Sequence, residues 1–214
     1  MHESINGVVF QDEKGAPPVA GWMRDGARFW DLVAEFELSS TQIADTLNVS
    51  RGERAVLNTL AGHLPALPAT PVSTSNAETY RGWIGGIEGE MPAHWRVPMA
   101  WSGRSVVHRD DLTEAERRDV EDAANIYFFG DPAHVATYRH AIESCYAPFD
   151  AVVYAVRRLK VEAGASLIIT GAPTILLAES IELEQDGRLV VIDTPCRVHV
   201  GTLTKHGAPA ASFN

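Results

Sequence analysis

The sequence predicts an α+β protein with a helical N-terminal half followed by a short stack of β-strands near the C-terminus. The stack is predicted by two consecutive 22-residue segments, Leu159–Ser180 and Ile181–Thr202, whose apolar positions coincide when one is written above the other. Pro173 and Pro195 fall at the same position of this repeat. A fixed period of this size is typical of solenoids, in which each unit buries its apolar face by stacking on the next. The helices are predicted by capping residues that precede apolar positions at helical spacing.

Two helices are predicted in the first 64 residues. Apolar residues at helical spacing indicate a helix from Phe29 to about Glu37. Ser50 followed three residues later by Glu53 forms a capping box, which predicts a second helix that ends at Gly62.

Two further helices are predicted directly before the strand stack. Thr113 and Glu116 form a second capping box, and the helix that they begin is expected to end near Gly130. Asp131 followed by Pro132 is typical of a helix start, because aspartate caps a helix and proline fits its first position. We expect these helices to cover the open end of the stack, since an uncovered β-edge invites aggregation.

Changes in composition divide the chain into four predicted regions. Residues 1–64 are the helical N-terminal region, and residues 65–76, rich in proline and serine, are a linker. Residues 77–150 hold a tryptophan- and glycine-rich segment followed by the two capping helices. Residues 151–214 hold the strand stack, which contains two to two and a half units.

Alternating apolar and polar residues predict three short strands in each 22-residue unit, with turns at glycine, aspartate and proline. This is the arrangement of a right-handed parallel β-helix. From Val152 to Leu203, the rung length and turn placement resemble the pectate-lyase-like class of β-helices. The resemblance implies the architecture alone, because no catalytic motif of an enzyme family accompanies it. The alternative is an antiparallel β-sandwich or a cupin-like barrel whose hairpins happen to align.

The same alternation predicts an apolar strip on the outside of the stack. If the larger apolar residues of two strands point inward, then Ile168, Val190 and Ile192 must point outward. Exposed apolar patches of this kind usually mark contacts, so these three residues are the predicted interface. The stack is also shorter than the three or so repeats that a solenoid needs. We therefore expect its own helices, a protein partner or a second copy to complete it.

Composition limits the possible partners and the location. The net charge of −10 argues against binding to nucleic acids or anionic membranes, which relies on lysine and arginine. No run of about 18 apolar residues could span a membrane, and no secretory signal is recognisable. A cytoplasmic location is therefore expected. Two cysteines, Cys145 and Cys196, are too few for a disulfide framework.

Residues Thr41 to Ser50 resemble the first helix and turn of a helix-turn-helix DNA reader, with Ala44 and Leu47 at positions that this family uses. Arg54 departs from the pattern, because the family usually places a buried aliphatic residue there. The segment is also balanced in charge, whereas affinity for DNA depends on neutralising phosphates. A DNA-binding regulator is one alternative function.

Lys160, Glu162 and Glu184 are the first candidates for catalysis. On stacked strands, Lys160 would lie beside Glu182 and Glu162 beside Glu184, at the strand spacing of about 4.8 Å. Two carboxylates at this spacing could share a proton, which would raise the pKa of one of them. In water the same side chains would simply be solvated.

His108, Asp110 and Asp111 form the densest local cluster of titratable residues and are the second candidates. They precede the helix that Thr113 caps, so their carboxylates could equally serve the helix N-terminus. The histidines show no metal-binding spacing, and no motif for a phosphate, dinucleotide or serine nucleophile is present. No metal and no cofactor are therefore predicted.

These features favour a non-catalytic assembly or accessory protein that acts through the apolar β-helix face, with a protein partner or as a homo-oligomer. An enzyme or binding protein that acts on a carbohydrate or a small acidic ligand is a second hypothesis. The DNA-binding regulator is the third.

Overall fold

The computed structural model describes residues 3–5, 8–11, 20–23, 29–58, 67–84, 95–106 and 108–206. The chain forms two compact units. Met1–Val72 and Val152–Asn214 make up the first, which we call the strand unit, and Ser73–Ala151 make up the second, the helical unit. The helical unit is thus inserted between two parts of the strand unit.

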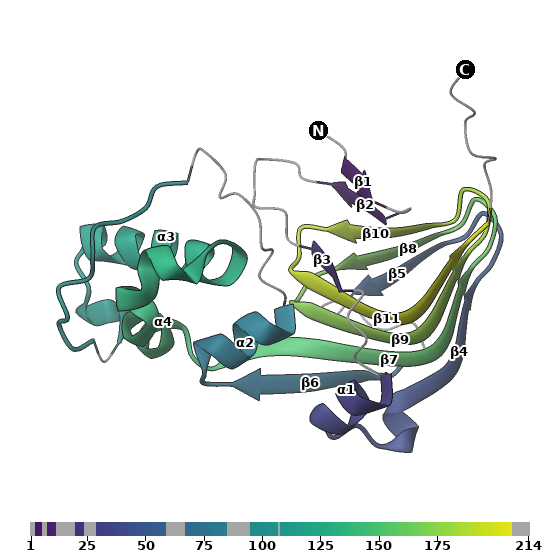
Figure 1. Ribbon diagram of the computed structural model, residues 1–214, viewed down its shortest axis with the longest axis horizontal. Coiled ribbons are helices and arrows are strands. Elements are labelled where there is room, and N and C mark those ends of the chain that lie inside the picture. The colour runs from purple at the N-terminus through teal and green to yellow at the C-terminus, as the bar shows by residue number, and fades with distance from the viewer. Residues whose placement is uncertain are drawn as a thin grey trace. The chain divides into compact units, whose positions relative to one another are not determined.

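Two sheets face each other in the strand unit (Figure 1). The first sheet contains, in spatial order, β1 (Glu3–Ile5), β2 (Val8–Gln11), β10 (Arg188–Ile192), β8 (Ser166–Thr170) and β5 (Arg54–Asn58). The second sheet contains β3 (Ala20–Met23), β11 (Cys196–Lys205), β9 (Thr174–Leu183), β7 (Phe149–Val161) and β4 (Ile43–Val49), and β6 (Ala69–Thr74) also pairs with β7. Helix α1 (Phe29–Glu35) contacts β9 and β11.

The two 22-residue segments stack in the register that the sequence predicts. Leu159 lies beside Ile181 in the second sheet, and Leu167 lies beside Leu189 in the first. The pairing is parallel in both sheets. The predicted correspondence between the two segments is therefore confirmed.

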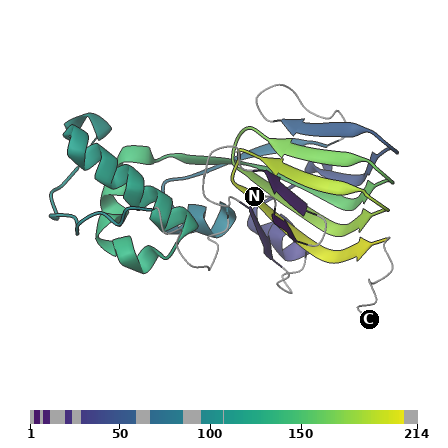
Figure 2. The same ribbon diagram turned by 90° about the horizontal axis from the view of Figure 1, so that it is seen from above.

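A third copy of the repeat lies in the N-terminal half, where the sequence predicted helices. Strands β4 and β5 pair in parallel with β7 and β8, so that Leu47 lies beside Leu159 and Ala55 beside Leu167. Figure 2 shows this copy in blue beside the green and yellow strands of the later copies. The helical unit therefore separates in sequence two copies that are neighbours in space.

The turns between the sheets are also equivalent in the three copies. Gly52, Gly164 and Asp186 occupy one turn position and have φ angles of 71°, 69° and 60°. This left-handed conformation costs glycine little and is tolerated by aspartate. The glycine at two of the three positions is therefore explained by the backbone path.

The buried apolar residues of both sheets form one core between them. Inward positions in β9 are Leu176 and Ala178, and then Ile181 and Leu183. The residues that face inward thus have even numbers up to Ala178 and odd numbers from Ile181 on. The change occurs at Glu179 and Ser180, and Glu179 is paired with no residue of either neighbouring strand. The long strands β7, β9 and β11 are each continuous and curved (Figure 1), and each leaves one residue out of the register at the equivalent position. One bent strand therefore stands where two short strands were predicted.

The predicted fold class is wrong. Within the described residues the chain is a mixed α/β protein with parallel sheets and four α-helices, rather than a helical N-terminal half followed by a β-helix. The N-terminal half contributes strands to both sheets. The antiparallel sandwich or cupin-like barrel is excluded as well, because every pair of strands with a determined register is parallel, apart from β1 with β2.

The helix predicted from Ser50 is wrong for a specific reason. Ser50 and Glu53 do form one contact of a capping box, in which the Ser50 N–H donates to Glu53 Oε2 at 2.9 Å, and the Glu53 N–H donates to the Ser50 carbonyl at 2.9 Å. These contacts close the turn between β4 and β5 instead of starting a helix. Burial of Ala55 and Leu57 between the sheets outweighs local propensity. The helix-turn-helix resemblance is also wrong, because Ile43–Val49 is a strand.

The helical unit confirms two of the helix predictions. Helix α3 (Glu114–Phe129) begins at the Thr113 capping box and ends at Gly130. Asp131 caps a 3₁₀ helix, η3 (Pro132–Tyr138), which continues into α4 (Arg139–Tyr146).

The remaining elements of the helical unit are α2 (Ala77–Ile84) and the 3₁₀ turn η2 (Arg109–Asp111). Tyr80 stacks on Phe149 and contacts Phe128 edge-on, with ring centroids about 5 Å apart in both pairs. Among the residues that the structure describes, no helix is long and apolar enough to cross a membrane.

Tyr154 provides a test of the strand-unit core. Its hydroxyl is fully buried and has no hydrogen-bond partner among the described residues, and burial raises its pKa. A buried polar group without a partner costs about 1–3 kcal/mol. Tyr154→Phe should therefore raise the free energy of unfolding by about 1 kcal/mol in denaturant titrations.

Tyr138→Phe is the matched control, because Tyr138 is also buried but its hydroxyl donates to the Met99 carbonyl. This change should lower the free energy of unfolding by about 1 kcal/mol. A loss of stability in both variants would contradict the unsatisfied state of the Tyr154 hydroxyl.

Candidate functional site

A hollow of about 390 Å³ lies over the outer face of the first sheet. It is lined by strands β5, β8 and β10 and by the turns that precede them. The lining residues are Gly52, Arg54, Gly164, Ser166, Ile168, Asp186, Arg188, Val190 and Ile192. The structure thus brings all three residues of the predicted apolar strip into one hollow.

The parallel register arranges the outward side chains of this face in two rows across the strands. Arg54, Ser166 and Arg188 form a polar row, in which neighbouring strands are about 4.8 Å apart. Val56, Ile168 and Val190 form an apolar row two residues further along each strand. The hollow therefore combines an apolar floor with a cationic rim.

The apolar row is exposed to different extents. Val56 is 40% exposed, whereas Ile168 is only 7% exposed. Val190 and Ile192 are half-buried. Ile168 thus forms the bottom of the hollow, and Val56 extends the strip toward the solvent.

The sequence-based predictions did not place Val56 and Arg54 on this face. Both lie in Arg54–Asn58, which alternates between outward and inward residues as a strand should. The helix prediction from Ser50 concealed that alternation. The signal was present in the sequence but could be recognised only once β5 was known to be a strand.

Arg54 and Arg188, which we call the rim arginines, make no side-chain hydrogen bond or ion pair with any residue that the structure describes. Among the described residues, one carboxylate, that of Asp186, lines the same hollow. A pair of guanidinium groups beside an apolar surface is suited to an acidic partner, because arginine binds carboxylates through two parallel hydrogen bonds.

The first catalytic candidates lie together on the outer face of the second sheet, at its turns. Glu162 accepts hydrogen bonds from the Asn48 side chain and the Arg51 N–H, both at 3.0 Å. Glu184 forms an ion pair with Lys160 at 2.7 Å and accepts the Ala163 N–H at 3.1 Å. Each glutamate therefore links its own copy of the repeat to the preceding one.

These contacts lower the pKa of both carboxyl groups instead of raising one. Hydrogen bonds from Asn48 and from the Arg51 N–H lower the pKa of Glu162. The hydrogen bond from Lys160 lowers the pKa of Glu184 and raises the pKa of Lys160. Both glutamates are thereby held as carboxylates, a state suited to structural contacts and not to proton donation.

The second group of candidates, His108, Asp110 and Asp111, lies in and beside the turn η2. The His108 N–H donates to Asp111 Oδ2 at 2.8 Å, and the Asp111 carbonyl accepts from Arg104 at 3.2 Å. All three candidates are exposed. The Asp111 carboxylate thus caps the turn.

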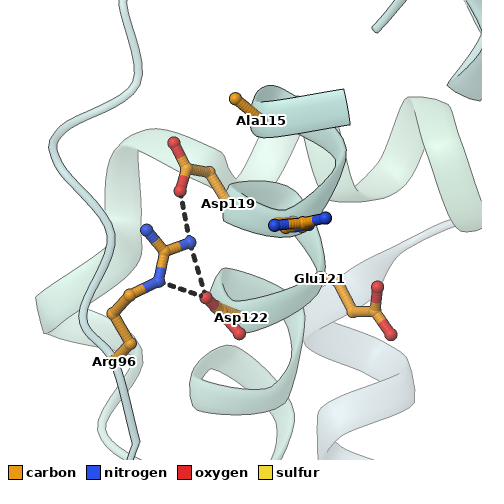
Figure 3. A pocket seen from close by; sticks show the side chains of 6 residues that line it. Arg96, Ala115, Asp119, Glu121 and Asp122 are labelled. Carbon is orange, nitrogen blue, oxygen red and sulfur yellow. Dashed lines mark hydrogen bonds and ion pairs between the residues drawn. The ribbon is translucent and has the colours of Figure 1, made fainter. Parts of the chain in front are cut away.

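A second hollow, of about 490 Å³, lies on the acidic surface of α3 (Figure 3). Arg96 reaches across it and binds Asp119 and Asp122, with its Nε 2.7 Å from Asp122 Oδ2. Glu121 points away from this contact in Figure 3. The arginine is satisfied by carboxylates of its own unit, so the arrangement fastens the segment around residue 96 to α3.

Neither metal-binding clusters nor reactive thiols occur in the described part of the chain. No group of three or more histidine, cysteine, aspartate and glutamate residues lies close enough there to hold a metal ion. Cys196 is fully buried in the strand-unit core, and burial raises its pKa to about 12. Cys145 is half-buried, and its pKa is also raised by burial.

Comparisons with protein-family models, with curated proteins and with solved structures found no match for this chain. The geometry of the two hollows and of the outer contacts is therefore the basis for a functional hypothesis.

The contacts of Glu162 and Glu184 predict how stability depends on pH. Their pKa values lie below the ordinary 4.5 in the folded state. Their contribution to stability is therefore present above pH 4.5 and is lost as the pH falls through the folded-state pKa values. Replacing both residues with glutamine should lower the melting temperature at pH 7 and flatten its decline in acid, measured by circular dichroism.

Glu121→Gln is the matched control, because Glu121 is exposed and makes no hydrogen bond or ion pair with the described residues. This variant should show the pH dependence of the unmodified protein. If the melting temperature falls as steeply in acid without Glu162 and Glu184 as with them, these two carboxylates do not stabilise the folded state.

Proposed function

We propose that this chain is a non-catalytic assembly protein that binds another protein surface through the outer face of its first sheet. The observation that carries the proposal is the hollow in which the apolar strip lies beside the rim arginines. Exposed apolar patches on protein surfaces mark contacts. Arginine is also enriched at protein interfaces, whose buried cores are more apolar than the rest of the protein surface.

The shape of the hollow supports a protein partner in preference to a small molecule. It is open on the outer side of three adjacent strands, whereas small-molecule sites enclose most of the surface of their ligand. The exposed Val56 continues the apolar surface beyond the hollow. A broad, open surface of this kind suits the apolar core of an interface with a polar rim.

The chemistry of the hollow supports a binding role and not a catalytic one. Ser166 is its hydroxyl-bearing residue, and the side chains beside it in the same row are arginines. A serine nucleophile requires an adjacent general base, and none of the described residues that line the hollow is a histidine. Glu162 and Glu184, the other candidates, are engaged in contacts between copies of the repeat.

Site-specific photocrosslinking tests the proposal. Val56 is replaced with p-benzoylphenylalanine, which an exposed position can accommodate, and cells that naturally make the chain are irradiated. We expect one crosslinked product of discrete mass, containing either a second copy or one other protein. Mass spectrometry identifies it.

Two controls accompany this experiment. The photoreactive residue at Thr202, an exposed position of β11 in the second sheet, should give no such product. Combining the Val56 replacement with Val190→Asp should remove the product, because it places a charge in the apolar row. If Val56 yields no product, or the same product as Thr202, the outer face of the first sheet is not a binding surface.

A further inference from the structure

Besides Val56, a second large apolar residue of the strand unit is exposed, and it lies in helix α1. Its buried residues, Phe29 and Val33, face inward. Trp30 is 50% exposed, and Asp31, Ala34 and Glu35 are also exposed. Among the described residues of the strand unit, Trp30 and Val56 are the large apolar side chains with the greatest exposure.

The exposed residues of α1 form two rows, because residues four apart lie on the same side of a helix. Trp30 and Ala34 form an apolar row, and Asp31 and Glu35 form an acidic row beside it. Neither carboxylate has a hydrogen-bond or ion-pair partner in the part of the chain that the structure describes. α1 thus presents an apolar row beside an acidic one, and the hollow presents an apolar row beside a cationic one.

The local structure holds Trp30 in place at the surface. Its ring packs edge-on against Phe29, with centroids 5.1 Å apart, and the Arg157 guanidinium lies 5.9 Å from its centroid. Arg157 is itself bound by Glu179 at 3.1 Å and Asp45 at 3.5 Å. A side chain that is ordered before binding loses less conformational entropy on binding.

We propose that α1 of a second copy of this chain docks in the hollow, with its Trp30 on the apolar strip and its Asp31 and Glu35 facing the rim arginines. This inference rests on the proposed function and names the partner. It also gives a role to two surfaces of opposite charge, the rim arginines and the acidic row of α1, which do not pair with each other within one chain.

The spacings of the two surfaces are compatible. Asp31 and Glu35 are separated by about 6 Å along the helix axis. The rim arginines are two strands apart, or about 9.6 Å at their backbones. The long arginine side chains can close the difference, and Ser166 between them leaves room because it is small.

A different exposed apolar pair fits less well. Val97 and Met99 are 42% and 87% exposed, but the segment that carries them also contains Arg96 and Arg104. Both arginines are already paired with carboxylates of α3, and residues 95–106 contain no carboxylate that could face the rim arginines. Charge complementarity therefore favours α1 as the occupant.

Docking of this kind does not close on itself as a dimer. α1 packs on β9 and β11 of the second sheet, which faces the first sheet in Figure 1. The hollow lies on the outer face of the first sheet. Each bound copy would still present its own free hollow or free helix. Such head-to-tail contacts generate rings or filaments, so we expect species larger than dimers as concentration rises.

Charge reversal tests the inference with the full chain alone. One variant carries Arg54→Glu and Arg188→Glu, and the other carries Asp31→Arg and Glu35→Arg. Sedimentation velocity over a concentration series should show association for the unmodified chain. Each variant alone should associate more than about tenfold less tightly, because like charges then face each other.

Mixing the two variants provides the decisive comparison. In the mixture, each rim glutamate of the first variant meets the arginines on α1 of the second, and the unchanged α1 of the first variant meets the unchanged rim arginines of the second. Attractive contacts therefore form only between unlike copies. We expect the mixture to recover the association of the unmodified chain, in assemblies that alternate between the two variants, although neither variant associates alone.

Arg158→Glu and Asp110→Arg serve as matched controls. Both residues are exposed, and neither belongs to α1 or to the hollow. They should leave association unchanged. Circular dichroism and melting curves check that every variant is folded, and Trp30→Ala, which changes no charge, should weaken association as well.

Three results would overturn the inference, and they differ in what they mean for the proposed function. An unmodified chain that stays monomeric excludes a second copy as the occupant, while a crosslinked product with another protein at Val56 would keep the proposed function. If reversing the charge of the rim arginines abolishes association but reversing the charges on α1 does not, α1 is not the occupant of the hollow, while the proposed function of the hollow is kept. Association that neither reversal affects excludes the hollow itself from self-assembly.

Discussion

The rest of the structure depends on the parallel register in which the copies of the repeat stack. Each ladder places a residue beside its equivalent in the next copy, so Leu47, Leu159 and Ile181 form one column of the buried core. Side chains alternate between the two faces of a strand, and a slip of one residue would expose the whole column. The inward columns therefore also determine which residues face outward.

This constraint explains how the chain tolerates a helical unit inside its repeat. The copy made of β4 and β5 precedes the insertion, and its neighbours β7 and β8 follow it. The entropic cost of closing a loop grows only slowly with loop length. Columns of buried residues can therefore align copies that are distant in sequence, provided that the apolar positions agree.

The outer faces of the two sheets differ in how their polar groups are satisfied. On the second sheet, Asn48 binds Glu162, Lys160 binds Glu184, and Glu182 lies 3.0 Å from His206, each contact joining one copy to the next. On the first sheet, the rim arginines have no such partner among the described residues. The contacts on the second sheet stabilise the stack, whereas the rim arginines on the first sheet are exposed.

The sequence by itself determined the 22-residue period, the pairing of Leu159 with Ile181, and the outward position of the apolar strip. All three follow from the alternation and spacing of residues that are close along the chain. Only the tertiary structure decided that Ser50 and Glu53 close a turn and that Arg54 lies in one row with Arg188. Capping contacts are local and fit either a helix or a tight turn, so burial of the following residues selected the strand. The row depends on strand pairing, which joins residues that the helical unit separates in sequence.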